Sequence, residues 1–300
     1  MKLLDDVNQP RKKPRPAKPI KQPVRVDAYY RAQLQSLVRL MAKRVNDKIL
    51  PIIKEDKEQY IKDGLYTKDD WSDRITAALD ALAAEFTSSA FATQFRRIAQ
   101  IVVERVSSTV TNRLIDSVNA AVGVNIRPLL SEREMNDFIR AEIEVNTRLI
   151  KSVPEQYLYR VENAVYQGMI DGDAPTTIAK NIQHETGVTY RRAKIIARDQ
   201  TSKLTGAIVE RRQEQAGITH YRSVDSGDER VSGNPNGKYP NAKISCWGIA
   251  RKDIGFGPGV YTWKDGASWG GQTGLHPGRH HNLCRCTATP VFDFELPDKK

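Results

Sequence analysis

The segment LHPGRHHNLCRC, residues 275–286, contains three of the five histidines and two of the three cysteines of the chain. Zinc favours cysteine sulfur at about 2.3 Å and histidine nitrogen at about 2.0 Å, with four donors at the corners of a tetrahedron. In an extended CRC segment, Cys284 and Cys286 point to one face while Arg285 points to the other. The segment therefore suggests a zinc site.

The third cysteine, Cys246, lies well before this segment in the chain. Cys246, His276, Cys284 and Cys286 would form a structural set that ties the start of an irregular region to its end. His280 and His281 are the other available donors. A different interpretation stays open, in which the cysteines are small buried core residues and the histidines lie on the surface before a turn.

The same histidines, together with Asp228 and Glu229, admit a catalytic interpretation, in which a divalent ion cleaves phosphodiesters. Nothing in their spacing specifies a nucleophile with its base, and adjacent carboxylates are also common in turns. The chain has no GxGxxG, P-loop or G-x-S-x-G motif. We therefore expect no enzymatic activity. A metal-dependent nuclease, or a toxin-associated module built on the same domain, is the alternative.

The region that must position these donors, residues 218–300, differs from the rest of the chain. ITHYRSV predicts a short strand, and the following segments are rich in Gly, Asn and Pro, which predicts turns. Such a small, irregular α+β domain has a thin core and commonly needs a metal or a covalent link to be stable. We expect a zinc ion to serve that purpose here.

Residues 26–173 carry apolar side chains at intervals of three and four, which predicts a helical domain whose stripes form its core. Asp27 is placed as a helix N-cap, Ser131 and Glu134 fit a capping box, and Gly123 ends a long pattern. A helical connector, residues 174–217, follows, with one helix ending at Gly187 and a second running from a Thr189 cap to Gly217. The expected fold is a mainly α N-terminal region followed by a small, loop-rich α+β domain.

Residues 1–25 combine prolines with basic side chains, and the whole chain has a formal net charge of +11. This composition predicts a disordered basic arm that binds DNA phosphates without sequence preference; a solvated leader that aids solubility is the alternative. The candidate DNA-binding residues are Arg11, Lys12, Lys13, Arg15, Lys18, Lys21 and Arg25. No apolar run is long enough to span a membrane, and three cysteines suit a reducing cytoplasm.

Several motifs occur here in an ordered series: RRAKIIARDQTSKLTGAIVERRQEQAGITHYRSVDSGDERV, and later HPGRHHNLCRCTATPV. In this order they resemble the phage head morphogenesis proteins, the family typified by protein F of phage Mu and the minor capsid protein of phage SPP1. The resemblance covers residues 174–292, and the order of the motifs is more specific than any one of them. The matching motif residues include Arg198, Asp199, Thr201, Asp228, Glu229 and Arg230.

The resemblance implies a minor capsid protein that acts in virion assembly and DNA packaging, present in few copies and associated with the portal protein and other capsid components. Such a protein is found in the host cytoplasm during assembly and then inside the capsid, and some members contact DNA. The family pattern also suggests a zinc knuckle with a Cys or His pair after the DERV element.

This chain departs from that pattern, because Ser232, Gly233 and Asn234 follow the DERV element and no Cys or His appears before Cys246. The fourth ligand therefore stays open, and His280 or His281 could replace His276 or Cys246. A structural adaptor with neither metal nor DNA contact is a third class of function.

Overall fold

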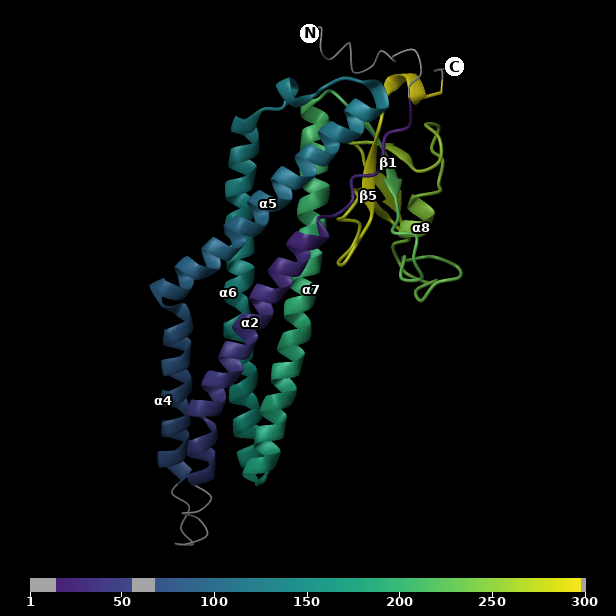
Figure 1. Cartoon of the computed structure of the whole chain (residues 1–300). Helices are drawn as coiled ribbons and strands as arrows, with labels where there is room; N and C mark the ends of the chain where they lie inside the picture. The colour runs from purple at the N-terminus through teal and green to yellow at the C-terminus, as the bar shows by residue number, and fades with distance from the viewer. Residues whose placement is uncertain (1–14, 56–67, 298–300) are drawn as a thin grey trace. The chain divides into compact units, whose positions relative to one another are not determined.

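A computed structural model describes residues 15–55 and 68–297, and it confirms the expected fold class (Figure 1). Long helices make up most of the chain, and all the strands lie in its C-terminal part. The helices are α2 (Val24–Lys48), α4 (Lys68–Thr87), α5 (Ser89–Val122), α6 (Glu132–Ile170) and α7 (Pro175–Gln215), with a short 3-10 helix at Arg127–Leu129. None of these described helices combines the length and apolarity needed to cross a membrane.

The apolar stripes expected from the sequence are buried in the helices. In α5, for example, Val102, Val106 and Val110 have no solvent exposure. Gly123 follows the last turn of α5 with a φ of 76°, a left-handed conformation that suits glycine and ends the helix. The apolar side chains that repeat every three or four residues therefore lie in the core, as the sequence predicted.

Three local predictions were wrong. Asp27 is not an N-cap, because α2 begins at Val24 and the Asp27 amide donates to the Pro23 carbonyl oxygen within the first turn.

Gly187 does not end a helix, because α7 runs through it, and the Thr189 hydroxyl donates to the Glu185 carbonyl oxygen instead of capping a new helix. Burial of apolar residues on both sides, such as Ile182 and Ala193, outweighs the cost of about 1 kcal/mol for a glycine within a helix.

The Ser131 hydroxyl accepts from the Glu134 amide at 3.3 Å, as a helix cap should. The Glu134 carboxylate, however, accepts from the Gln215 side chain at 3.0 Å, a distant partner that no local motif indicates.

The chain packs as two compact units, and the long helices α5, α6 and α7 contribute residues to both. Unit 1 takes in the described residues of Met1–Asp27, Val102–Glu142 and Arg198–Lys300, and unit 2 those of Ala28–Ile101 and Ile143–Ala197. These units differ from the consecutive segments 1–25, 26–173, 174–217 and 218–300 expected from the sequence. A linear division fails here because α5, α6 and α7 each contribute to both units.

Unit 1 contains a three-stranded antiparallel sheet in the order β2-β1-β5, formed by Val260–Thr262, His220–Val224 and Thr287–Val291. A separate hairpin pairs β3 (Ala267–Trp269) with β4 (Gln272–Leu275). The Tyr221 ring stacks on the Trp263 ring at 4.0 Å, and the Trp263 indole nitrogen donates to the Gln213 side-chain oxygen at 3.0 Å. The sheet is thus anchored to α7, and β5 begins directly after Cys286.

Residues 15–23 are not the disordered arm that we expected. Their backbone donates from Arg15 to the Ala121 carbonyl oxygen and from Ile20 to the Ala288 carbonyl oxygen, at 3.1 and 3.2 Å. Ala17 and Ile20 are buried, and these two apolar anchors offset the entropy cost of ordering the segment.

The basic side chains of Arg15, Lys18, Lys21 and Arg25 are exposed, as DNA contact would require. Arg11, Lys12 and Lys13 lie outside the described residues. The expectation of disorder is thus corrected for residues 15–25 and untested for residues 1–14.

Candidate metal centre

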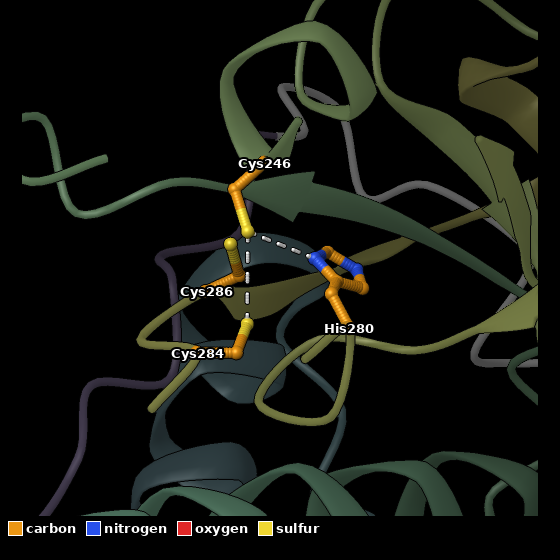
Figure 2. A group of neighbouring side chains, drawn as sticks. All are labelled: Cys246, His280, Cys284 and Cys286. Atoms are coloured by element: carbon orange, nitrogen blue, oxygen red, sulfur yellow. Dashed lines mark hydrogen bonds between the residues drawn. The ribbon is translucent and has the colours of Figure 1, made fainter. Parts of the chain in front are cut away.

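Four side chains of unit 1, Cys246, His280, Cys284 and Cys286, converge on one buried point (Figure 2). Their four ligand atoms all lie within 4.8 Å of one another. The Cys246 sulfur is 3.4 Å from Nδ1 of His280 and 3.8 Å from the Cys284 sulfur. Three sulfurs and one imidazole supply the four donors that a tetrahedral zinc site needs, so this cluster could hold a metal ion.

Cys246 is positioned by the loop that follows the DERV element. It is the first residue of a short helix, α8 (Cys246–Ile249), whose N-cap Ser245 accepts from the Gly248 amide at 2.8 Å. The Cys246 amide donates to the Ser232 hydroxyl at 3.1 Å, and the Trp247 amide donates to the Ser232 carbonyl oxygen at 3.1 Å. Ser232, which sequence reasoning did not single out, therefore fixes the start of the helix that presents the sulfur.

Cys284 and Cys286 are positioned by α7. Leu283 has a φ of 63°, which is uncommon for a side chain larger than glycine, and its amide donates to the Asp199 carboxylate at 2.7 Å. The Ser202 hydroxyl donates to the Cys284 carbonyl oxygen. Two polar side chains of one helix thus hold the turn that aims both sulfurs into the cluster.

Arg285 does not belong to the cluster, although Cys284 and Cys286 on either side of it do. Its guanidinium makes two hydrogen bonds to the Asp228 carboxylate. That pair lowers the pKa of Asp228, with the hydrogen bond from Arg285 as the main cause. This ion pair therefore links the DERV loop to the CRC segment.

The three thiols differ in acidity. Hydrogen bonding with Cys284 raises the pKa of Cys246 to about 12, and hydrogen bonds with Cys246 and Cys284 raise the pKa of Cys286. Burial acts to raise the pKa of Cys284, but hydrogen bonds from Cys246, Cys286 and His280 hold it well below its usual value. A bound divalent cation would supply the charge that favours the thiolate form of all three cysteines.

His276, our preferred histidine ligand, does not belong to the cluster; its alternate His280 occupies that place. The His276 ring stacks on Trp263 at 5.8 Å with an interplanar angle of 9°, and its Nδ1 lies 3.5 Å from the Glu210 carboxylate. Burial is the main cause that lowers the pKa of His276, which favours a neutral ring in the aromatic stack. His276 is therefore a half-buried packing residue of unit 1.

His281, the other alternate, borders the cluster. Its Nε2 lies 3.1 Å from the Cys246 sulfur and 3.0 Å from the Ser232 hydroxyl, and its Nδ1 lies 2.7 Å from the Asn282 carbonyl oxygen. With Nδ1 directed at the Asn282 carbonyl and Nε2 at the Ser232 hydroxyl, His281 supports the position of Cys246 beside the four-donor set.

Replacing His280 with alanine is expected to weaken metal binding at least about tenfold, because it removes one of four donors. His276→Ala should retain the metal and reduce only stability, since that ring packs on Trp263. Metal content by elemental analysis, and affinity by competition with a chelating dye, distinguish the two variants. Retention of the metal by His280→Ala together with its loss from His276→Ala would restore the assignment made from sequence.

The remaining motif residues surround the cluster without joining it. Glu229 forms an ion pair with Lys238 at 2.7 Å, and Asp228 is engaged by Arg285. Arg198 and Arg230 line a cleft next to the CRC segment. Thr201 is buried on α7, and its hydroxyl has no hydrogen-bond partner among the described residues. The two carboxylates of the catalytic interpretation are therefore committed to cations of the protein.

Comparison with known proteins found a similar protein in Haemophilus influenzae, which is described as uncharacterized. It is 28% identical over 297 residues, a match that includes 98% of this chain and 59% of that protein. The chain therefore spans less than two thirds of the relative's length. No family model matches the chain, and no solved structure matches it. A longer bacterial protein thus contains a region similar to almost all of this chain.

Proposed function

We propose that Cys246, His280, Cys284 and Cys286 bind a structural zinc ion that stabilises the C-terminal part of unit 1. The observation that carries this proposal is the set of four buried donors, three sulfurs and one imidazole, within 4.8 Å of one another. Thiolate-rich sites with four protein donors are typical of structural zinc, whereas catalytic zinc keeps one position for water or substrate. Elemental analysis of the purified protein, with about one zinc per chain expected, tests the proposal.

We further propose that the chain is a phage head morphogenesis protein, a minor capsid component present in few copies and associated with the portal protein. In support, the separated motifs of the resemblance meet in space: Asp199 holds the Leu283 amide, and Asp228 holds Arg285. On this proposal the protein acts in virion assembly and DNA packaging, in the host cytoplasm during assembly and inside the capsid afterwards.

Co-purification with a portal protein, and detection in purified virions by mass spectrometry, test this role. Failure of both tests would favour a structural adaptor of some other assembly. Absence of zinc and of DNA binding would support that adaptor function further.

The alternative function, a metal-dependent nuclease, has weaker support. A four-donor cluster offers no open coordination position, and Asp228 and Glu229 are paired with Arg285 and Lys238. Incubation with supercoiled plasmid and Mg²⁺, Mn²⁺ or Zn²⁺ tests it. Nicking that disappears in Asp228→Asn would favour the nuclease over a purely structural protein.

The DNA contact that we propose for the N-terminal basic residues leads to a prediction about salt dependence. Deleting residues 1–14, which include Arg11, Lys12 and Lys13, should reduce the slope of log K against log salt by roughly 0.9 for each phosphate that the shortened chain no longer neutralises. The deletion stops before Arg15 because residues 15–23 pack within unit 1.

Binding to a duplex, measured by fluorescence anisotropy over a salt series, gives this slope. A chain of full length with glutamine at Arg11, Lys12 and Lys13 separates the effect of charge from that of length. An unchanged slope in both variants would show that this part of the arm does not bind DNA.

A further inference from the structure

A strongly cationic cleft of about 950 Å³ opens in unit 1 beside the metal centre. Five basic residues and one exposed tyrosine that line it are Arg198, Arg230, Lys238, Lys243, Arg285 and Tyr239. No carboxylate is among the lining residues. The cleft has therefore the charge and the size to accept an anionic ligand larger than a single phosphate.

Part of this positive charge has no direct ion pair within the described residues. Lys238 and Arg285 are paired with Glu229 and Asp228, respectively. Arg198, Arg230 and Lys243, in contrast, form no ion pair with any carboxylate of the described residues. Because like charges repel at such short range, a bound polyanion would relieve a repulsion that the folded chain otherwise retains.

The electrostatic environment of Arg198 shows how close these charges lie. Burial is the main cause that lowers the pKa of Arg198. The charges of Arg285 and Arg230 lower it further, while the carboxylates of Asp27 and Asp228 act to raise it. Residues from α7, from the DERV loop and from the CRC segment thus bring their guanidinium groups together at one place.

Tyr239 adds a second feature, because its side chain is 57% exposed within this ring of cations. Cations that follow a phosphate backbone, combined with an aromatic ring on which a base stacks, are typical of proteins that bind single-stranded nucleic acid. We propose that the cleft binds a nucleic-acid single strand, with phosphates at Arg198, Arg230 and Lys243 and a base against Tyr239. This inference adds a second nucleic-acid-binding surface to the proposed function, apart from the N-terminal basic residues, and rests on that function to this extent.

The cleft and the metal cluster share one loop. His281, Leu283 and Arg285 line the cleft, whereas His280, Cys284 and Cys286 supply donors to the cluster. A metal ion bound on one side of the loop would therefore fix the wall of the cleft on the other. Stripping the zinc-loaded protein with a chelator is expected to weaken binding of the strand as well.

The decisive experiment compares two double variants of the full-length, zinc-loaded protein. Arg230→Ala with Lys243→Ala removes two cations of the cleft, and Lys252→Ala with Lys264→Ala removes two exposed lysines of the same unit outside it. The net charge changes equally in both. The probe is a fluorescein-labelled oligothymidylate of about 15 nucleotides, with binding measured by anisotropy across a salt series.

The cleft variant is expected to bind the oligonucleotide at least tenfold more weakly and with a smaller salt slope, and the control variant within twofold of the wild type. Tyr239→Ala should weaken binding about fivefold or more with an unchanged slope, because stacking involves no counterion release. Equal losses in the two double variants, or no loss in either, would overturn the proposal. Competition by pyrophosphate or ATP as strong as that of unlabelled oligonucleotide would also overturn it, in favour of a small phosphate ligand.

Zinc content and portal co-purification, measured on the same preparations, separate this inference from the proposed function. If the wild-type protein binds zinc and the portal protein but not the oligonucleotide, only the proposal that the cleft binds a single strand is refuted. If the purified protein contains no zinc but still binds the strand through Arg230 and Lys243, the proposed structural zinc site is refuted instead.

Discussion

Replacing Cys284 with serine is expected to abolish zinc binding and to destabilise unit 1 by more than about 4 kcal/mol. The change removes one of three sulfurs from a buried four-donor set and leaves a polar hydroxyl among the remaining thiols. Since a zinc ion bound only by the folded state adds its binding energy to folding, its removal lowers the free energy of unfolding directly. Other core contacts of unit 1, such as the stack of Tyr221 on Trp263, remain and limit the destabilisation.

Chemical denaturation followed by tryptophan fluorescence, with and without a chelator, measures this effect. The wild-type protein should become less stable when the chelator is added, whereas Cys284→Ser should already be destabilised and should not respond further. Ser226→Ala, a change at an exposed serine of the same unit, serves as the control for substitution itself. A wild-type protein that unfolds at the same denaturant concentration with and without the chelator would contradict a stabilising role of the metal.

Replacing Gly206 with alanine is expected to destabilise the protein by about 1–3 kcal/mol, although this glycine lies within α7. In most helices the same change stabilises, because alanine is the better helix former by about 1 kcal/mol. Here an added Cβ would lie 2.1 Å from the Pro277 carbonyl oxygen, and backbone cannot rotate away as a flexible side chain can. The clash would push α7 away from the HPGR turn that leads to His280.

Gly187→Ala provides a matched control in the same helix. An added Cβ at Gly187 would meet only the end of the Arg191 side chain, at an ordinary 3.7 Å. This variant is expected to be more stable than the wild type by up to about 1 kcal/mol. Thermal unfolding of the two variants measures the contrast, and stabilisation by both substitutions would show that α7 and the turn are less tightly packed than the structure indicates.

The fold class and the donor types could be predicted from the sequence because both follow from local patterns. Apolar residues at intervals of three and four identified the helices, and alternation in the CRC segment predicted that Cys284 and Cys286 contribute to one site. Gly187 shows where local rules stop, because whether a glycine ends a helix depends on what the turns on either side of it bury.

The choice between His276 and His280 could not be made from the sequence, since it depends on contacts between distant residues. Trp263 and Glu210 engage His276, and neither lies near it in the chain. The cationic cleft was missed for the same reason. Its cations come from α7, two loops and the CRC segment, and only the folded chain places them together.

The contact between the N-terminal segment and β5 has a consequence for self-association. β5 is the outer strand of its sheet, and the Ile20 amide donates to the Ala288 carbonyl oxygen on that strand. Unpaired backbone groups on an outer strand invite pairing with another molecule, and proteins commonly cover them. The Ile20 amide occupies one such group, so a segment translated before the helices blocks intermolecular β-pairing at Ala288 on a strand translated after them.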